Sequence, residues 1–249
     1  MLNREREQQI INILKATEGF VTVKELCETL FASESSIRRD LKSLEQRGFV
    51  KRSHGGATAV TNFSNIVTFN QRTRENISAK REIAQKAATL INDGDVIFLD
   101  QSSTAFYFAN EIKNRGSLTV VTNNIEIMML LSESMVKVIS SGGYLSSENR
   151  NCLIGADAED TFRKIYADIG FFSVKALSND GIVTDCSPEE ISVRNVMIKN
   201  AKKIALLCDS TKFGDCATYK QCDISDVDYL ISEGTKAQQF KEFEEIVFL

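Results

Sequence analysis

The sequence has 249 residues, of which 43% are hydrophobic and 26% charged, a composition typical of globular proteins. This length predicts two domains, and no signal-peptide pattern or apolar run of about 20 residues argues for export or a membrane span, so the expected location is the cytoplasm. Six cysteines without a C-x-x-C pair and a single histidine argue against a zinc site, and we predict neither metal nor cofactor.

Positive charge is concentrated near the beginning of the chain. Residues 1–60 contain 10 Lys/Arg and 8 Asp/Glu, whereas residues 61–249 contain 20 and 26, and the whole chain has a net charge of −4. Residues 35–52 contain six basic residues and only two acidic ones. Contact with DNA phosphates requires a local basic surface of this kind. The charge distribution therefore predicts nucleic-acid binding by the first part of the chain.

Residues 1–57 show the pattern of a winged helix-turn-helix. Apolar spacing predicts a helix over residues 4–17. Thr22 followed three residues later by Glu25 is a capping box, which predicts the start of a second helix. Ser33 can cap a third helix, whose inward stripe is Ile37, Leu41 and Leu44.

The third helix has the features of a DNA recognition helix. Hydroxyl and guanidinium groups project together near its start, where such a helix reads base edges while neighbouring donors hold phosphates. The predicted contacts from this helix are Ser35, Ser36, Arg38, Arg39 and Lys42.

The wing is predicted from a strand over residues 49–52, a turn over 53–56 and a return strand over 57–60. The two glycines of the turn permit close backbone approach to DNA. The predicted wing contacts are Lys51, Arg52 and His54, with the alternative that His54 is a turn residue without a function.

After a linker predicted over residues 58–76, the pattern is that of an α/β domain over residues 77–249 that binds an effector and oligomerises. Helices are predicted over 79–91, 103–115, 125–131 and 189–200, and strands over 96–99, 118–121, 136–139, 169–174, 204–208 and 229–231. This alternation indicates a Rossmann-like, mostly parallel sheet covered by helices.

Polar and small residues follow these strands. Ligands of open parallel sheets bind beyond the carboxyl ends of the strands, and free amides at a helix start can hold a phosphate. Helix caps and tight turns are the structural alternative for each motif. The predicted effector residues are Asp100, Ser102, Ser103, Thr104, Thr122, Asn123, Gly142, Gly143, Lys175, Asp209 and Lys212.

The first 60 residues resemble the DeoR family of repressors in four stretches: Arg4-Glu5-Arg6 with Ile10, Val23-x-Glu25-Leu26, Ser33-x-x-Ser36-Ile37-Arg38-Arg39-Asp40-Leu41 and His54-Gly55-Gly56-Ala57. The later segments are similar to the family's sensor domain, which resembles ribose-5-phosphate isomerase in fold and generally responds to phosphorylated sugars. The resemblance adds Glu190 to the effector residues. It also implies roles for Arg72, Lys80, Gly155, Asp168, Gly181, Phe213 and Gly214.

The chain departs from the family at three positions. Ser36 stands where the family usually has threonine, so a methyl group that could contact thymine is lost. Ser102 replaces a glycine of the Asp-x-Gly-Thr-Thr motif, and Lys175 lies where a Gly-rich run usually ends in aspartate. These two changes could narrow the pocket, add a donor and a charge, or abolish sensing.

The predicted function is sequence-specific DNA binding by a repressor of a carbohydrate-metabolism operon, controlled by a phosphorylated sugar or related metabolite. One alternative is an isomerase-like enzyme using Asp100, Glu190 and Lys212 for proton transfer, although the winged helix has no catalytic purpose. Another is a DNA-binding protein whose α/β domain only oligomerises. A homodimer or homotetramer is expected, because palindromic half-sites mirror a twofold axis of the protein.

Overall fold

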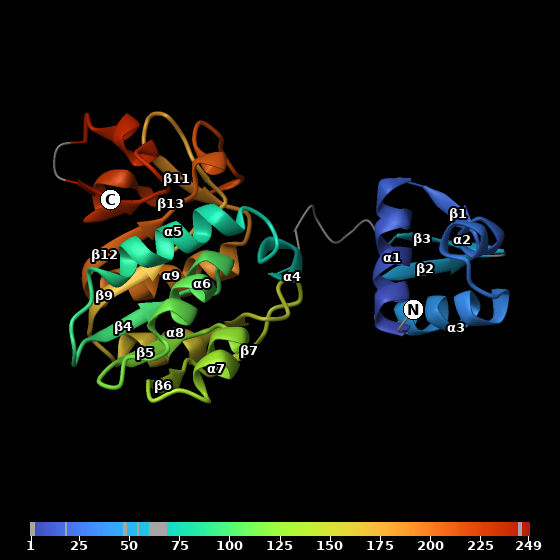
Figure 1. The fold of residues 1–249 in the computed structure, drawn as a ribbon, viewed down its shortest axis with the longest axis horizontal. Helices are drawn as coiled ribbons and strands as arrows, with labels where there is room; N and C mark the ends of the chain where they lie inside the picture. The colour runs from blue at the N-terminus through green and yellow to red at the C-terminus, as the bar shows by residue number, and fades with distance from the viewer. Residues whose placement is uncertain (1–2, 18, 47–48, 54, 60–68, 244–245) are drawn as a thin grey trace. The chain divides into compact units, whose positions relative to one another are not determined.

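The computed structural model describes the chain apart from residues 1–2, 18, 47–48, 54, 60–68 and 244–245, so His54 lies outside the described residues. Two units, Met1–Asn65 and Ile66–Leu249, are each described by themselves (Figure 1). The division between them falls inside the segment predicted as a linker. Among the described residues, no helix combines the length and the apolar character needed to cross a bilayer.

The amino-terminal unit is a helix-turn-helix with a small antiparallel sheet. Its elements are α1 (Asn3–Ala16), β1 (Phe20–Thr22), α2 (Val23–Leu30), α3 (Glu34–Gln46), β2 (Val50–Ser53) and β3 (Gly56–Ala59), with the strands in the order β1-β3-β2. The predicted capping box is present, since Glu25 N donates to Thr22 Oγ1 at 3.1 Å and Thr22 N donates to Glu25 Oε2 at 2.7 Å. Ile10, Leu14, Leu26, Ile37, Leu41 and Leu44 form its core.

The carboxy-terminal unit is built on a seven-stranded parallel sheet in the order β15-β14-β12-β9-β4-β5-β6. The strands are β4 (Val96–Leu99), β5 (Thr119–Thr122), β6 (Lys137–Ser140), β9 (Ala167–Phe172), β12 (Ala201–Leu207), β14 (Tyr229–Ile231) and β15 (Val247–Phe248). Strand order reverses between β4 and β9. After β4 the chain adds β5 and β6 on one side of it, and then crosses to the other side to add β9, β12, β14 and β15.

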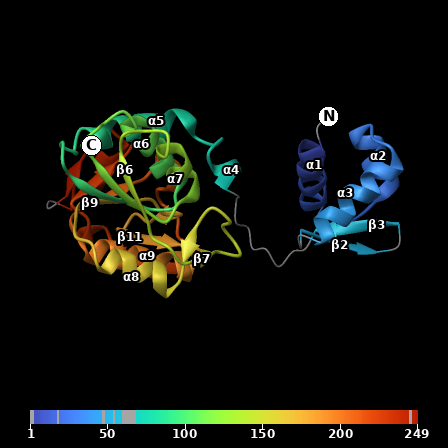
Figure 2. The same ribbon diagram turned by 90° about the horizontal axis from the view of Figure 1, so that it is seen from below.

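Helices cover both faces of this sheet (Figure 2). They are α5 (Ile77–Ala88), α6 (Ser103–Ile112) and α7 (Ile125–Leu131) on one face, and α8 (Ala156–Arg163) and α9 (Pro188–Lys199) on the other. The two faces bury separate apolar clusters, one centred on Phe108 and Phe171 and the other on Phe98 and Phe162. The predicted fold class, a small helix-turn-helix plus a parallel α/β domain, is therefore confirmed.

Several short elements differ from the sequence-based expectation. β10 (Ala176–Leu177), β11 (Ile182–Asp185) and β13 (Tyr219–Asp223) form a second, antiparallel sheet, and β7 (Tyr144–Leu145) pairs with β8 (Leu153–Ile154). None of these strands was predicted, because no long run of apolar residues marks them in the sequence. The predicted linker also contains the helix α4 (Phe69–Arg72), whose buried Phe69 packs edge-on against Phe106 with ring centroids 5.9 Å apart.

Candidate functional site

The outward face of α3 carries the side chains predicted to contact DNA. Ser35, Arg38, Arg39 and Lys42 are exposed, whereas Asp40 is buried on the opposite side. Asp40 Oδ2 forms an ion pair with Arg6 Nε of α1 at 2.6 Å. This pair ties α3 to α1 and so fixes which face of α3 looks outward.

Hydroxyl groups gather at the start of α3. Ser33 Oγ lies 3.1 Å from Ser35 Oγ and 2.9 Å from Ser36 Oγ, and it accepts a long bond of 3.4 Å from the backbone of Ser36. Ser36 is half-buried, so it is less available than the prediction supposed. Arg38 is held by Glu34 of the same helix, with Nε 2.9 Å from Oε1. Arg39 and Lys42 are thus the exposed cations of α3 for which the structure gives no ion pair in the described residues.

The wing is connected to α3 through Arg52, one residue before the end of β2. Glu45 Oε1 accepts from the backbone of Arg52 at 3.1 Å, and Glu45 Oε2 lies 3.5 Å from Arg52 Nη1. Lys51 is exposed beside it. A Cβ on Gly56 would lie 2.2 Å from Val21 O, so this glycine is required for packing against β1 and not for approach to DNA. Gly55, with φ of +83° and open space around it, supplies the left-handed turn.

In the carboxy-terminal unit, the edge where the strands end contains a buried polar network centred on Asp100, directly after β4. Asp100 Oδ1 accepts from Ser102 N and Oδ2 from Ser173 N, both at 3.1 Å. Ser173 follows β9, so one carboxylate bridges the two strands at the point where the strand order reverses. Ligands of open α/β sheets bind at such a switch point, beyond the carboxyl ends of the strands.

Arg194, on α9, is the buried partner of Asp100. Its side chain is 1% exposed, with Nε 3.4 Å from Asp100 Oδ2 and Nη1 3.1 Å from Asp185 Oδ2. Nη1 also donates to Gln221 Oε1 at 2.7 Å. The arginine therefore joins the switch point to β11 and β13 of the antiparallel sheet. Sequence reasoning missed it, although its i,i+4 spacing from Glu190 places both residues on one face of α9.

Glu190 forms the second part of the network. Its two carboxylate oxygens accept from Gln101 Nε2 at 2.7 Å and from Asn149 Nδ2 at 2.9 Å. Burial raises the pKa of Glu190, and the Arg72 guanidinium opposes that rise. Gln101, Asn149 and Arg72 were not predicted as effector residues. Arg72 had a signal in its place among the positions matching the family, and Gln101 had one in the polar stretch that follows β4.

Buried polar atoms without a hydrogen-bond partner gather at this same edge. In the described part of the chain they are Arg72 Nε, Gln101 Oε1, Thr104 Oγ1, Asn123 Oδ1, Asn124 Nδ2, Asn149 Oδ1, Arg194 Nε and Asp209 Oδ2, the last two of which still lie within ion-pair distance of a charged group. Each such group typically costs about 1–3 kcal/mol when left unsatisfied. Their concentration at the switch point is what a site for a polar molecule requires.

Two lysines add positive charge beside this network. Lys212 Nζ donates to Ser173 Oγ at 2.8 Å and lies 3.6 Å from Asp209 Oδ2. Lys80 is buried and donates to the carbonyl oxygens of Glu75, at 2.7 Å, and Arg72. Burial, and then repulsion from Lys212, lower the pKa of Lys80 to about 8. An anion placed here would stabilise the charged form of Lys80.

Three other predicted effector residues have a role in the fold itself. Ser102 caps α6 by accepting from Ala105 N at 3.0 Å, which accounts for serine in place of glycine. Thr122 Oγ1 accepts from Asn124 N at 3.1 Å, and a Cβ on Gly143 would lie 2.3 Å from Ile154 O. Lys175 is exposed in the segment between β9 and β10. Gly142 has φ of +68° and open space around it.

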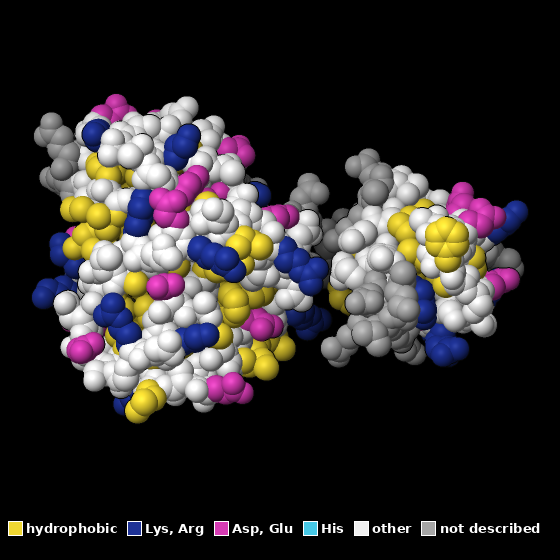
Figure 3. Space-filling model, in the orientation of Figure 1, with side chains coloured by type: hydrophobic (Ala, Val, Ile, Leu, Met, Phe, Trp, Pro, Cys, Tyr) yellow, Lys and Arg dark blue, Asp and Glu magenta, His cyan; other side chains and the backbone are white. Residues whose placement is uncertain are grey.

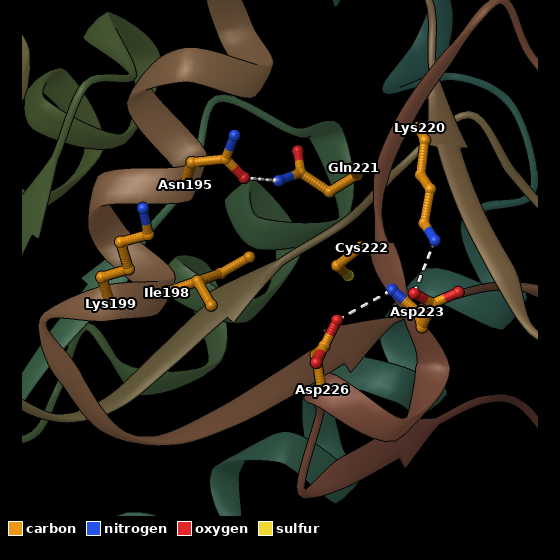
Figure 4. A pocket seen from close by; sticks show the side chains of 8 residues that line it. All are labelled: Asn195, Ile198, Lys199, Lys220, Gln221, Cys222, Asp223 and Asp226. Atoms are coloured by element: carbon orange, nitrogen blue, oxygen red, sulfur yellow. Dashed lines mark hydrogen bonds and ion pairs between the residues drawn. The ribbon is translucent and has the colours of Figure 1, made fainter.

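A separate groove of about 550 Å³ lies between α9 and β13 (Figure 4). Gln221 lies at its inner side and donates from Nε2 to Asn195 Oδ1 at 2.6 Å. Lys199, Lys220, Asp223 and Asp226 bring both signs of charge to its lining. On the face of the carboxy-terminal unit drawn in Figure 3, basic and acidic side chains are likewise interspersed, with no extended basic patch.

Two family models together match nearly the whole chain. A family model for the DeoR-like helix-turn-helix domain matches residues 6–63, and one for the DeoR C-terminal sensor domain matches residues 75–234. The HTH-type transcriptional regulator GlpR of Haloferax volcanii is 31% identical over 94% of this chain and 91% of its own length. The glycerol-3-phosphate regulon repressor of Escherichia coli is 29% identical over 94% of this chain and 92% of its own length. Ribose 5-phosphate isomerase A of Methanocaldococcus jannaschii aligns over 54% of this chain and 53% of its own, with 19% identity and a TM-score of 0.41.

Proposed function

The chain belongs to the DeoR family of DNA-binding transcriptional regulators, and from that premise we propose that it represses genes of carbohydrate metabolism under the control of a phosphorylated sugar or polyol. The family consists of regulators and not enzymes, so the isomerase alternative is set aside. The relative named as a glycerol-3-phosphate regulon repressor supports a phosphorylated polyol as the class of effector.

The observation that carries the effector proposal is the set of unpaired buried polar atoms at the switch point, next to Lys80 and Lys212. Amide and hydroxyl groups such as Gln101 Oε1 and Thr104 Oγ1 suit the hydroxyl groups of a sugar. The lysines, with the free amides at the start of α6, suit its phosphate. Asp100, whose oxygens are already occupied by two backbone amides and Arg194, acts as support for this site and not as the contact first predicted.

The DNA proposal assigns base contacts to Arg39 and to Arg38 after it leaves Glu34, with Ser35 and Lys42 beside them. Lys51 and Arg52 of the wing bind phosphates. This division follows from exposure on α3, whose inward face is fixed by Asp40, and from the position of the wing strands beside it.

The effector proposal is tested by calorimetry with the full chain and a panel of hexose, pentose and triose phosphates, glycerol 3-phosphate and inorganic phosphate. We expect one phosphorylated compound to bind with micromolar affinity and to release a DNA duplex selected from random sequences. Lys212→Met should weaken that binding at least about tenfold, because a charged partner of the phosphate is lost. The matched control is Lys164→Met, which changes an exposed lysine at the end of α8, just before β9 begins and so at the opposite edge of the sheet.

Two results would overturn the effector assignment. One is tight binding that Lys212→Met and Thr104→Val both leave unchanged, which would place the ligand elsewhere. The other is selective binding of DNA that no member of the panel alters, which would favour the alternative in which the α/β domain only oligomerises.

A further inference from the structure

Phe31 lies in the turn between α2 and α3 and combines two unfavourable features. Its side chain is 96% exposed, more than any other large hydrophobic side chain that is exposed in the described residues. Its backbone is left-handed, with φ of +49° and ψ of +44°. This conformation brings Cβ close to the following carbonyl oxygen, so helix ends of this kind usually carry glycine. Glycine would serve the turn better, so the fold itself does not account for phenylalanine here.

Asn76 is the other non-glycine residue with a positive φ in the described part of the chain, and its side chain has polar partners. Asparagine tolerates the left-handed region, and Asn76 Nδ2 donates to Asp209 Oδ1 and Thr211 Oγ1, each at 3.0 Å. At Phe31 the backbone N–H donates to Cys27 O and closes the end of α2, a bond that glycine would also make. The ring of Phe31 therefore adds nothing to this cap.

The turn places Phe31 close to the residues proposed to read bases. α3 begins at Glu34, three residues later, and Ala32 N donates to Cys27 O at 3.2 Å, so the turn is tight. In a helix-turn-helix the first helix of the motif crosses the DNA backbone, while the start of the second enters the major groove. The turn that joins them therefore lies at the wall of that groove.

The polar neighbours of Phe31 distinguish it from a protein-binding patch. The exposed residues nearest to it in sequence are Glu28, Thr29 and Ser33, whereas protein interfaces use contiguous apolar patches of a few hundred Å². The serines at the start of α3 bring hydroxyl groups and no methyl group to the groove. The apolar group that the major groove displays is the C5 methyl of thymine, and phenylalanine is among the side chains that contact it.

We infer that Phe31 contacts the C5 methyl group of a thymine in the major groove, next to the bases read by α3, and so adds an apolar element to operator recognition. The cost of phenylalanine in a left-handed, exposed turn is then offset only when DNA is bound. The inference rests on the proposed binding of α3 in a major groove and does not depend on which effector binds.

Phe31→Gly separates binding from stability. The variant removes the strained side chain and the exposed ring, so no thermal unfolding transition of the full chain, followed by circular dichroism, should move to a lower temperature. Affinity for the selected operator should nevertheless fall about tenfold, because the apolar contact is lost.

The partner of the ring is identified with modified DNA. Fluorescence anisotropy is repeated with duplexes in which each thymine of the operator is replaced in turn by deoxyuridine, which lacks the methyl group. We expect one replacement to weaken binding of the wild-type chain about fourfold, the loss that corresponds to one buried methyl group, and to leave the affinity of Phe31→Gly unchanged.

Two control variants complete the test. Phe31→Tyr keeps the ring and should keep the dependence on that thymine methyl. Lys51→Ala, which changes an exposed lysine of the wing, should weaken binding to every duplex without changing that dependence. A wild-type chain that selects no duplex contradicts the DNA proposal itself, before any variant is compared.

Four results would overturn the contact with thymine. Phe31→Gly could bind the operator as tightly as the wild-type chain, or respond to every deoxyuridine as the wild-type chain does. It could unfold at a lower temperature, which would show that the ring supports the fold. It could lose self-association in sedimentation equilibrium without DNA, which would assign the ring to a contact between copies of the chain.

Discussion

Most of the residues predicted to bind DNA are exposed, whereas most of those predicted to bind the effector are buried. On α3, Arg39 and Lys42 are exposed on a helix that the buried Asp40–Arg6 pair holds in place. At the switch point, Asp100 and Glu190 are buried and bonded to neighbouring residues. A surface that meets a large polyanion can leave its cations in water, whereas a pocket for a small molecule must hold its polar groups in position before the ligand arrives.

The difference is sharpest at the two central arginines. Arg194 is enclosed and pairs with two carboxylates, so we expect it to contribute to stability and to the shape of the site. Arg39 is exposed, so we expect it to contribute to DNA binding and not to stability. The following predictions test this contrast.

The largest effect is expected from Arg194→Met. It leaves Asp100 and Asp185 buried without their cation, and we expect the free energy of unfolding of the carboxy-terminal unit to fall by about 3–5 kcal/mol. Urea denaturation monitored by circular dichroism measures the change, since the chain has no tryptophan. The control Arg163→Met removes an exposed arginine of α8 with two acidic partners and should change stability by less than about 1 kcal/mol. Equal effects of the two substitutions would contradict the buried network.

Arg39→Ala should weaken binding to the selected operator by about 10- to 100-fold, because a bidentate contact with a base edge is worth about 1–3 kcal/mol. Thermal stability should be unchanged, since the side chain is exposed. Fluorescence anisotropy with operator and scrambled duplexes separates the loss of specificity from a general loss of affinity. Unchanged discrimination between the two duplexes would remove Arg39 from the base-reading surface.

Lys51→Ala should weaken binding to all duplexes alike, by about tenfold at low salt, with a slope of log affinity against log salt that is shallower by about 1. The same titrations repeated at several salt concentrations provide the measurement. A selective loss for the operator would instead place Lys51 at a base.

The smallest effect is expected from pH at Lys80, whose pKa is about 8 in the structure. The charged form dominates below that pH and is lost as the pH rises through it, and an anionic effector binds the charged form better. Affinity for the effector should therefore be highest below about pH 8 and fall roughly threefold above it, with proton uptake on binding. Calorimetry in two buffers of different ionisation enthalpy measures the uptake, and Lys80→Met should abolish it.

Local sequence patterns were sufficient for much of the amino-terminal unit and for the main parallel sheet. The capping box at Thr22 and the stripe of Ile37, Leu41 and Leu44 act between residues three or four apart, so they can be read without the fold. Four-residue buried strands such as β4 are marked by continuous apolar runs followed by polar residues. The edge of the sheet that carries the candidate site was predictable for the same reason, since parallel strands all end on one side.

Only the tertiary structure decided which polar residues at that edge support the fold and which remain unpaired. Asp100 and Ser102 looked like ligand contacts in the sequence, but backbone amides and a helix cap occupy them. Arg194, Gln101 and Asn149 looked ordinary, because all of their partners except Asp185 are 27 to 94 residues away in the chain. The short strands of the second sheet likewise depend on neighbours distant in sequence, and no local periodicity records such neighbours.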